Sequence, residues 1–167
     1  MPPGFVMRTP AATPVPEGCP PGRSGFLRAD RFPPMKLIVN VDGGARGNPG
    51  PAAIGVVVRD GEGNVLKDLG ETIGEATNNV AEYKALIRGI ELARELGADE
   101  LQIHGDSELV VKQMLGQYKV KHPDMKPLHA QAREALAGVS SWEISHVRRE
   151  QNAEADALVN QALDAAG

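Results

Sequence analysis

The sequence of 167 residues has a single cysteine, Cys19, no long apolar run and no excess of positive charge. A lone cysteine excludes an internal disulfide framework and is typical of a reducing compartment, so we expect a cytoplasmic protein. No stretch approaches the roughly 18 uncharged apolar residues that cross a bilayer, which excludes an integral membrane protein. A net charge of −4 also argues at first against nucleic acid, because duplex-binding proteins usually carry a basic patch.

The first 34 residues differ in composition from the rest of the chain. They hold nine of the 13 prolines and all three phenylalanines, and they show no helical or alternating period. Proline lacks a backbone N–H and blocks regular pairing, so we predict a disordered, proline-rich extension over 1–34 and one folded domain over 35–167. A start of the chain at Met35 is an alternative hypothesis for this boundary. The extension carries a net charge of +2, which leaves −6 on the domain.

From residue 35 onward, the pattern predicts an α/β fold. Three runs rich in valine and isoleucine, separated by Gly/Pro/Asn/Asp turns, predict three antiparallel strands joined by hairpins. Strands and amphipathic helices then alternate, which indicates βα units and a mixed five-stranded sheet flanked by helices. The predicted strands are 36–42, 53–60, 65–74, 100–106 and 142–147, and the predicted helices are 80–97, 107–116, 125–138 and 152–167.

Four carboxylates stand at special places in this pattern. Asp42 and Asp106 are predicted at strand ends, which deliver side chains to the crevice where α/β folds place their sites, and Glu82 and Asp156 in the first turns of helices. Singly, each has an ordinary explanation as a turn residue or as an acid favoured by the helix dipole. Together they indicate one site, and four ionised carboxylates that lie together require cations. Hard oxygen ligands select Mg²⁺ or Mn²⁺, and two such ions can activate water against a phosphodiester.

Four segments of the domain resemble, in order, the ribonuclease H family, type 1. They are DGGARGNPGPAAIGVVV from Asp42, TNNVAEYKALIRGIELA from Thr77, GDSELVVKQ from Gly105 and HVRREQNAEADALVNQAL from His146. The resemblance covers Met35 to Leu163 and is closest to the archaeal-like branch, which is also found in bacteria. It implies the ribonuclease H-like fold and cleavage of the RNA strand of an RNA/DNA hybrid by two metal ions, leaving 5′-phosphate and 3′-hydroxyl ends. It implies no obligatory protein partner, and we expect a monomer.

The resemblance also assigns roles to individual residues. The four acids match the family's metal ligands, and the residues that match its contacts to the hybrid have ordinary alternatives of their own. Capping of a helix is the alternative for Asn78, and turn geometry is the alternative for the two glycines. The positions that match substrate contacts are Gly43, Gly44, Asn48, Thr77, Asn78 and Asn79.

The segment before the last acid supplies two further candidate catalytic residues. His146 lies ten residues before Asp156, an offset that matches a family histidine that assists proton transfer or product release. Its alternative is an ordinary strand-end side chain. Arg149 lies closer to the site, and we favour it as the electrostatic contact to phosphate. We expect Asn152 to cap the last helix.

Two departures from the family pattern lower the affinity that we expect for the substrate. Glu108 stands where the best-known bacterial enzymes have a glutamine that contacts RNA, and an ionised carboxylate cannot donate a hydrogen bond. The segment 117–122 is short and only modestly basic where those enzymes carry a basic protrusion, so we expect weak, salt-dependent binding of the hybrid. Tyr118 in this segment either stacks on the substrate or packs in the core, and we expect Trp142 to belong to the core.

Two other classes of function stay open at this point. One is a hybrid or RNA binder without activity, against which the intact four acids argue, and the other is a nuclease of the same fold that acts on DNA ends or junctions. The acidity of the domain does not exclude a polyanionic substrate. Two divalent ions would offset the charge of the four acids and leave the domain nearly neutral.

Overall fold

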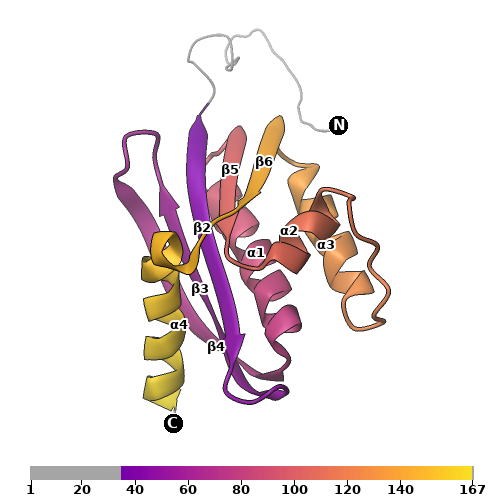
Figure 1. Ribbon diagram of the computed structural model, residues 1–167. Coiled ribbons are helices and arrows are strands. Elements are labelled where there is room, and N and C mark those ends of the chain that lie inside the picture. Colours follow the sequence, from indigo (N-terminus) through magenta and orange to yellow (C-terminus); the bar gives the residue numbers. More distant parts are fainter. Residues whose placement is uncertain (1–34, 167) are drawn as a thin grey trace, which may run out of the picture. The chain divides into compact units, whose positions relative to one another are not determined.

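The computed structural model describes residues 35–166 (Figure 1). The predicted extension over 1–34, with Cys19, and the last residue lie outside the described residues. No helix within 35–166 is both long enough and apolar enough to cross a membrane. The elements in chain order are β2 (Lys36–Ala45), β3 (Gly50–Arg59), β4 (Val65–Ala76), α1 (Asn78–Glu95), β5 (Glu100–Gly105), α2 (Glu108–Met114), α3 (Lys126–Leu136), β6 (Ser141–His146), the 3-10 helix η1 (Arg149–Asn152) and α4 (Ala153–Ala166).

The strands form one five-stranded sheet in the order β4-β3-β2-β5-β6. β2 pairs antiparallel with β3, and β3 pairs antiparallel with β4. β2 pairs parallel with β5, and β5 pairs parallel with β6. The predicted mixed five-stranded sheet is therefore confirmed, and β2 lies at its centre, where the antiparallel and parallel halves meet.

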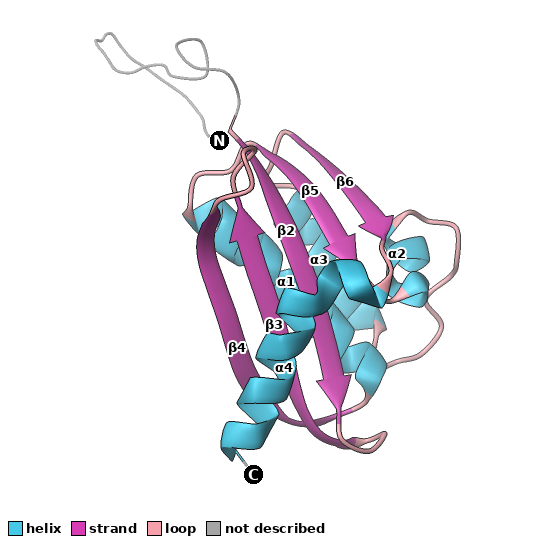
Figure 2. Ribbon diagram, turned by 60° about the vertical axis from the view of Figure 1, so that its left-hand side comes forward, coloured by secondary structure: helices cyan, strands magenta, loops and turns pink. Residues whose placement is uncertain are grey.

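Helices cover the two faces of the sheet unequally. Figure 2 shows α4 in front of the strands and α1 with α3 behind them. Leu37, Val39 and Val41 of β2 are buried towards α1, where they join the large core cluster. Gly89 on α1 permits this approach, because a Cβ atom there would lie 2.8 Å from a methyl group of both Val39 and Val41. The predicted apolar stripe of α1 packs into the same core, and Ile90 on this stripe is fully buried.

The opposite face of the sheet depends on a second close approach. Gly55 of β3 lies under α4, and a Cβ atom at this position would be 2.2 Å from the carbonyl oxygen of Ala155. Since no side chain fits between them, the backbones of strand and helix are nearly in contact. Ala155 precedes Asp156, so this contact also sets the position of one of the four acids.

Several boundaries differ from the predicted ones. β2 continues through the glycines to Ala45, so Asp42 lies within the strand, paired with Gly55, and is not at its end. The parallel pairing with β5 does stop one residue earlier, at Val41, which leaves Asp42 beside an opening in the sheet. Glu82 lies just beyond the first turn of α1, because that helix already begins at Asn78. Asp156 lies in the first turn of α4 as predicted.

The prediction for Asn152 was wrong. This side chain is 1% exposed and does not cap α4. Its Nδ2 donates to the backbone oxygen of Val41 at 2.8 Å, and its Oδ1 accepts from Asn40 at 3.0 Å. Asn152 therefore ties the segment before α4 to the central strand, because a buried amide has to satisfy both its donor and its acceptor.

The aromatic side chains of Tyr118 and Trp142 have different environments. Tyr118 is 47% exposed, which excludes core packing, and its ring lies 5.1 Å from Nζ of Lys112. Trp142 is half-buried and packs against the core cluster, as expected for a residue of an edge strand.

We predict that Gly55→Ala destabilises the fold by about 1–3 kcal/mol, because the added methyl group must push α4 away from β3. Gly61→Ala is the matched control, since nothing lies within 4 Å of a Cβ atom there. Urea denaturation of both variants measures the difference. Equal midpoints for the two variants would contradict the close contact.

Candidate active site

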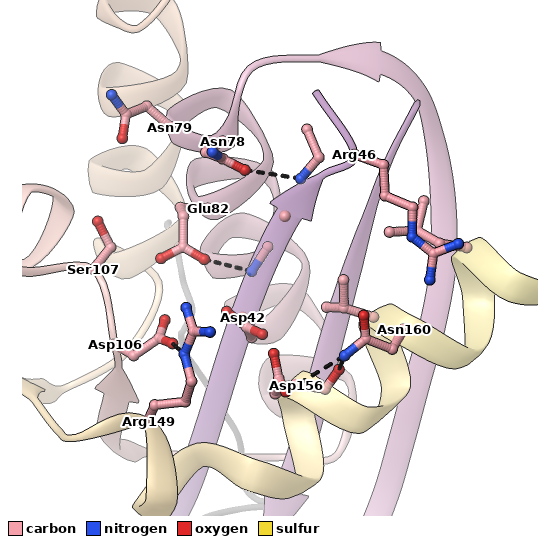
Figure 3. Close-up of a pocket in the computed structure, with 15 residues that line it drawn as sticks. Asp42, Arg46, Asn78, Asn79, Glu82, Asp106, Ser107, Arg149, Asp156 and Asn160 are labelled. Carbon is pink, nitrogen blue, oxygen red and sulfur yellow. Dashed lines mark hydrogen bonds and ion pairs between the residues drawn. The ribbon is translucent and has the colours of Figure 1, made fainter. Parts of the chain in front are cut away.

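Three of the predicted acids converge at the opening between β2 and β5 (Figure 3). Asp42 comes from β2, Glu82 from α1 and Asp106 from the residue that follows β5. One carboxylate oxygen from each lies within 4.8 Å of the other two. Asp42 is 6% exposed and Glu82 is 9% exposed, so two of the three are largely shielded from water.

Gly43 explains how α1 comes close enough to contribute Glu82. A Cβ atom at this position would lie 2.3 Å from the carbonyl carbon and oxygen of Ala81. The backbone N–H of Gly43 also donates to Oε1 of Glu82 at 2.5 Å. The absence of a side chain at Gly43 therefore serves helix packing, whereas contact of its backbone with RNA stays a prediction. Gly44 faces the other way, towards Val159 of α4.

Burial and mutual repulsion raise the pKa values of the two shielded acids. The pKa of Asp42 is raised to about 10 by burial first, and then by the charges of Glu82 and Asp106. Burial and the charge of Asp106 raise the pKa of Glu82 to about 8, against the lowering effect of the Gly43 N–H. Two carboxylates that resist ionisation beside a third fit a hard divalent cation, which supplies the missing positive charge.

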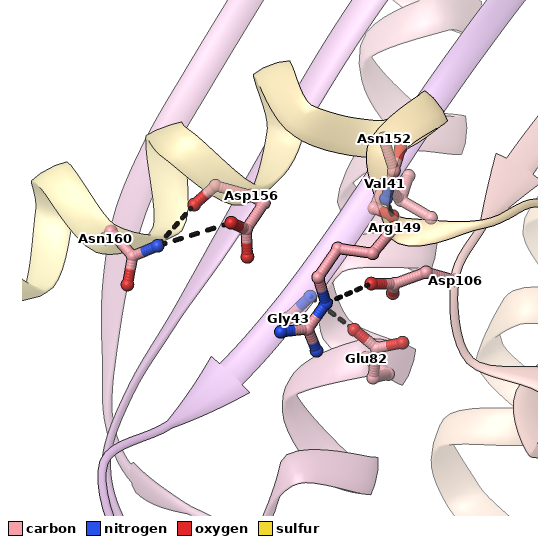
Figure 4. Close-up of polar contacts among 8 residues, drawn as sticks. All are labelled: Val41, Gly43, Glu82, Asp106, Arg149, Asn152, Asp156 and Asn160. Atoms are coloured by element: carbon pink, nitrogen blue, oxygen red, sulfur yellow. Dashed lines mark hydrogen bonds and ion pairs between the residues drawn. The ribbon is translucent and has the colours of Figure 1, made fainter.

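The fourth acid lies across the same cavity. Asp156 lines a cavity of about 380 Å³ together with the other three acids, but it is not within the close group of three. Nδ2 of Asn160 donates to the backbone oxygen of Asp156 at 3.2 Å and to its Oδ2 at 3.4 Å (Figure 4). Asn160, one turn further along α4, thus restrains the carboxylate at the mouth of the cavity.

The structure separates the two residues predicted from the HVRREQN segment. Arg149 lines the cavity, and its Nε lies 3.8 Å from Oδ2 of Asp106. His146 is exposed at the end of β6 and is not among the lining residues. The pKa of Glu108 is lowered chiefly by Lys112 and, to a smaller extent, by the charge of His146. Glu108 itself is paired with Lys112 at 2.9 Å.

Two of the remaining predicted substrate contacts, Asn48 and Asn78, tie the end of β2 and the loop after it to α1, and we call this pair the clamp. The backbone N–H of Asn78 donates to Oδ1 of Asn48 at 3.1 Å, and that of Ala45 donates to Oδ1 of Asn78 at 2.8 Å. Thr77, not Asn78, is the N-cap, since its hydroxyl accepts from the N–H of Val80. The two asparagine oxygens are thus engaged within the protein, which leaves their NH₂ groups as the atoms able to meet a ligand. The cavity is lined by Asn78 and Asn79, but not by Asn48 or Thr77.

Sequence reasoning missed three polar residues of the cavity wall: Arg46, Ser107 and Asn160. Asn160 could have been found from its spacing of four residues from Asp156, which places both side chains on one helix face. Arg46 is the only cation between Asp42 and Pro51, inside the first of the matching segments. Ser107 caps α2 by accepting from the N–H of Val110 at 3.3 Å.

This fold and cavity agree with the comparison with known protein families. The model of the reverse transcriptase-like family matches residues 40–162. Ribonuclease HI of Halobacterium salinarum is 50% identical over 123 residues, which are 74% of this chain and 62% of that protein. A bifunctional protein of Mycobacterium tuberculosis is 47% identical over 133 residues, which are 79% of this chain and 36% of that protein. Ribonuclease H of Bordetella pertussis is 33% identical over 139 residues, which are 75% of this chain and 87% of that protein.

Solved structures show the same likeness. The ribonuclease H1 of Halobacterium salinarum superposes with a TM-score of 0.77 and 47% identity, covering 78% of this chain and 98% of the other. LC11 ribonuclease H1, solved in complex with an RNA/DNA hybrid, gives a TM-score of 0.74 and 48% identity with the same coverage. The chain therefore belongs to the ribonuclease H family. It spans 62% of the length of the Halobacterium relative and 36% of the mycobacterial one.

We predict that the metal-free protein loses stability as the pH rises from about 6 to about 8. In this range ordinary carboxylates are already ionised, whereas Asp42 and Glu82 hold protons in the folded state that they release on unfolding. Raised folded-state pKa values of this kind lower the free energy of unfolding as the pH rises. Saturating Mn²⁺ should therefore raise the melting temperature more at the higher pH.

Thermal denaturation at both pH values, with Mn²⁺ and with a chelator, measures this effect. Asp42→Asn is the matched control, and it should remove the part of the pH slope that comes from Asp42 and most of the gain from Mn²⁺. Glu82 should keep its own part of the slope, because burial and Asp106 raise its pKa. A melting temperature of the metal-free protein that rises over this interval would contradict the shifts.

Proposed function

We propose that this protein is an endoribonuclease that hydrolyses the RNA strand of RNA/DNA hybrids with two Mg²⁺ or Mn²⁺ ions, leaving 5′-phosphate and 3′-hydroxyl ends. The observation that carries the proposal is the group of three carboxylates within 4.8 Å, with a fourth on the wall of the same cavity. The names of the relatives support it, as does the LC11 structure with a bound hybrid.

The residues of the chain divide the work of catalysis. When bound, the two ions activate water and stabilise the departing 3′ oxygen. Asp42, Glu82 and Asp106 would hold them from one side of the cavity, and Asp156 would do so from the other. The Gly43 N–H keeps the Glu82 carboxylate oriented. The guanidinium of Arg149 lies beside Asp106, and we assign it to electrostatic stabilisation of the charge that develops on the phosphate.

Recognition of the hybrid falls to the clamp and the N-terminus of α1. The NH₂ groups of Asn48, Asn78 and Asn79 are suited to donate to base edges and sugars of the minor groove, where the 2′-hydroxyl distinguishes RNA from DNA. Thr77, at the N-terminus of α1, is suited to hold a phosphate of the DNA strand. The backbone of Gly43 and Gly44 completes the proposed contact with RNA. Since one chain supplies every element of the site, we propose that the protein is active as a monomer. We also propose a cytoplasmic location, which the single cysteine supports.

We expect Asp106→Asn to lower the rate of hybrid cleavage in Mn²⁺ by roughly 10²-fold or more, the scale of losing one preorganised electrostatic group. Asp68→Asn, an exposed position on β4, is the matched control and should cleave like the wild type. The assay uses one labelled sequence presented as a hybrid, an RNA duplex, a DNA duplex and a junction.

Equal cleavage by the wild type and Asp106→Asn would refute the assignment of the site. Binding of the hybrid without metal-dependent turnover would instead identify a binder without activity. Preferred cleavage of the DNA duplex or the junction would place the substrate in another class.

Substitutions of Arg149 and His146 should slow different steps of the reaction, because of these two residues only Arg149 lines the cavity. We expect Arg149→Ala to slow a single turnover by roughly tenfold or more, as expected for a charge that meets the scissile phosphate. His146→Ala should slow steady-state turnover alone if the histidine assists product release. A larger single-turnover loss in His146→Ala than in Arg149→Ala would reverse these roles.

A further inference from the structure

Arg46 lies in the wall of the active-site cavity, and the proposed function gives it no role. It belongs to the short loop between β2 and β3, and it lines the cavity beside Asn78 and Asn160. Figure 3 shows Arg46 and Arg149 on opposite sides of the acids. Of the residues that line this cavity, four are acids, and these two arginines are the basic residues.

The backbone around Arg46 is held firmly in place. Its N–H donates to the carbonyl oxygen of Pro51 at 2.8 Å, which closes the loop. The N–H of the preceding Ala45 donates to Asn78 of α1, so the loop is also tied to the helix. Gly50 allows the closure, because a Cβ atom there would lie 2.2 Å from the carbonyl oxygen of Arg46. These contacts therefore fix the position of the Arg46 backbone, from which its side chain extends, relative to the acids.

The guanidinium of Arg46 is held by a single exposed partner. Nη2 lies 2.6 Å from Oδ1 of Asp164, in the last turns of α4, and the two side chains are 48% and 70% exposed. An exposed pair of this kind contributes little to stability, so a competing anion can replace it. A guanidinium has five N–H donors, and Asp164 accepts from one of them. The other donors of Arg46 have the planar geometry that can bind two oxygens of a phosphate.

The position of Arg46 suits a phosphate beyond the scissile one. Arg46 and Leu163 line the active-site cavity and also a second cavity of about 390 Å³, which extends to Thr72 and Glu75 of β4. Because Arg46 lines both cavities, a nucleic-acid strand that ran from the acids to the second cavity would pass its guanidinium. A cation at this exit, opposite Arg149, would hold the strand in register.

We propose that Arg46 binds a backbone phosphate of the hybrid outside the scissile position, and that Asp164 holds the guanidinium ready until the phosphate displaces it. This inference rests on the proposed function, because it names a further contact of the same site with the same substrate. It assigns Asp164 to positioning, since its carboxylate acts through Arg46 and does not touch the substrate.

The test is the affinity of the full-length chain for a fluorescent RNA/DNA hybrid in Ca²⁺, measured by anisotropy over a series of salt concentrations. Arg46→Ala should raise Kd by roughly tenfold, as expected for a hydrogen-bonded charge, and should reduce the slope of log K against log salt by about one. Arg46→Lys should keep the slope, because the charge stays, while Kd still rises through loss of the fork. Asp164→Asn should lower Kd, because the guanidinium no longer has to leave a partner.

Arg88→Ala is the matched control. Arg88 also pairs with acids, Glu91 at 3.7 Å and Glu95 at 3.8 Å, but it does not line the cavity, so Kd and the slope should stay at wild-type values. Wild-type Kd and slope in Arg46→Ala would overturn the inference, as would weakening in Asp164→Asn equal to that in Arg46→Ala. Failure of the wild-type chain to bind the hybrid at all would overturn the proposed function as well, so the two failures are distinguishable.

Discussion

The backbones of β2 and α1 meet at Gly43, and the active site depends on this contact. Because no Cβ separates strand from helix there, Glu82 reaches the acids of β2 and β5, and the Gly43 N–H holds its carboxylate. Gly55 does the same on the other face of the sheet, where α4 approaches closely enough to present Asp156. Two glycines of the central strands thus determine how far apart the acids from two helices lie. The opening left where β5 parts from β2 is the space that they share.

The close placement of acids in this space raises the pKa values of two of them, and this effect bears on the net negative charge of the chain. Burial and like charges raise the pKa values of Asp42 and Glu82, so without cations the two side chains favour bound protons. Divalent cations provide the compensation that the protein itself lacks, and the net charge of −4 is therefore compatible with a polyanionic substrate. The cations of the cavity wall, Arg46 and Arg149, lie at its two sides, where a strand would enter and leave.

Local patterns predicted most of the fold, and long-range contacts account for the errors. Strand and helix order follow from periodicity and turn residues, which depend on neighbours in sequence. Asn152 was misassigned because its partners, Asn40 and Val41, lie more than a hundred residues away and become visible only in the folded sheet. The continuation of β2 to Ala45 was missed because backbone pairing needs no side-chain pattern. Likewise, the four acids were predicted from motifs, but the separation of Asp156 from the other three depends on how α4 docks.

The central claim is that buried carboxylates hold protons until a cation replaces them. Calorimetric titration of Mn²⁺ into the metal-free, full-length chain, in buffers of different ionisation enthalpy near neutral pH, counts the protons exchanged. We expect net proton release on binding to the wild type and less release in Asp42→Asn, where Glu82 is the remaining acid with a raised pKa. Tight binding of Mn²⁺ to the wild type with no proton release would contradict the claim.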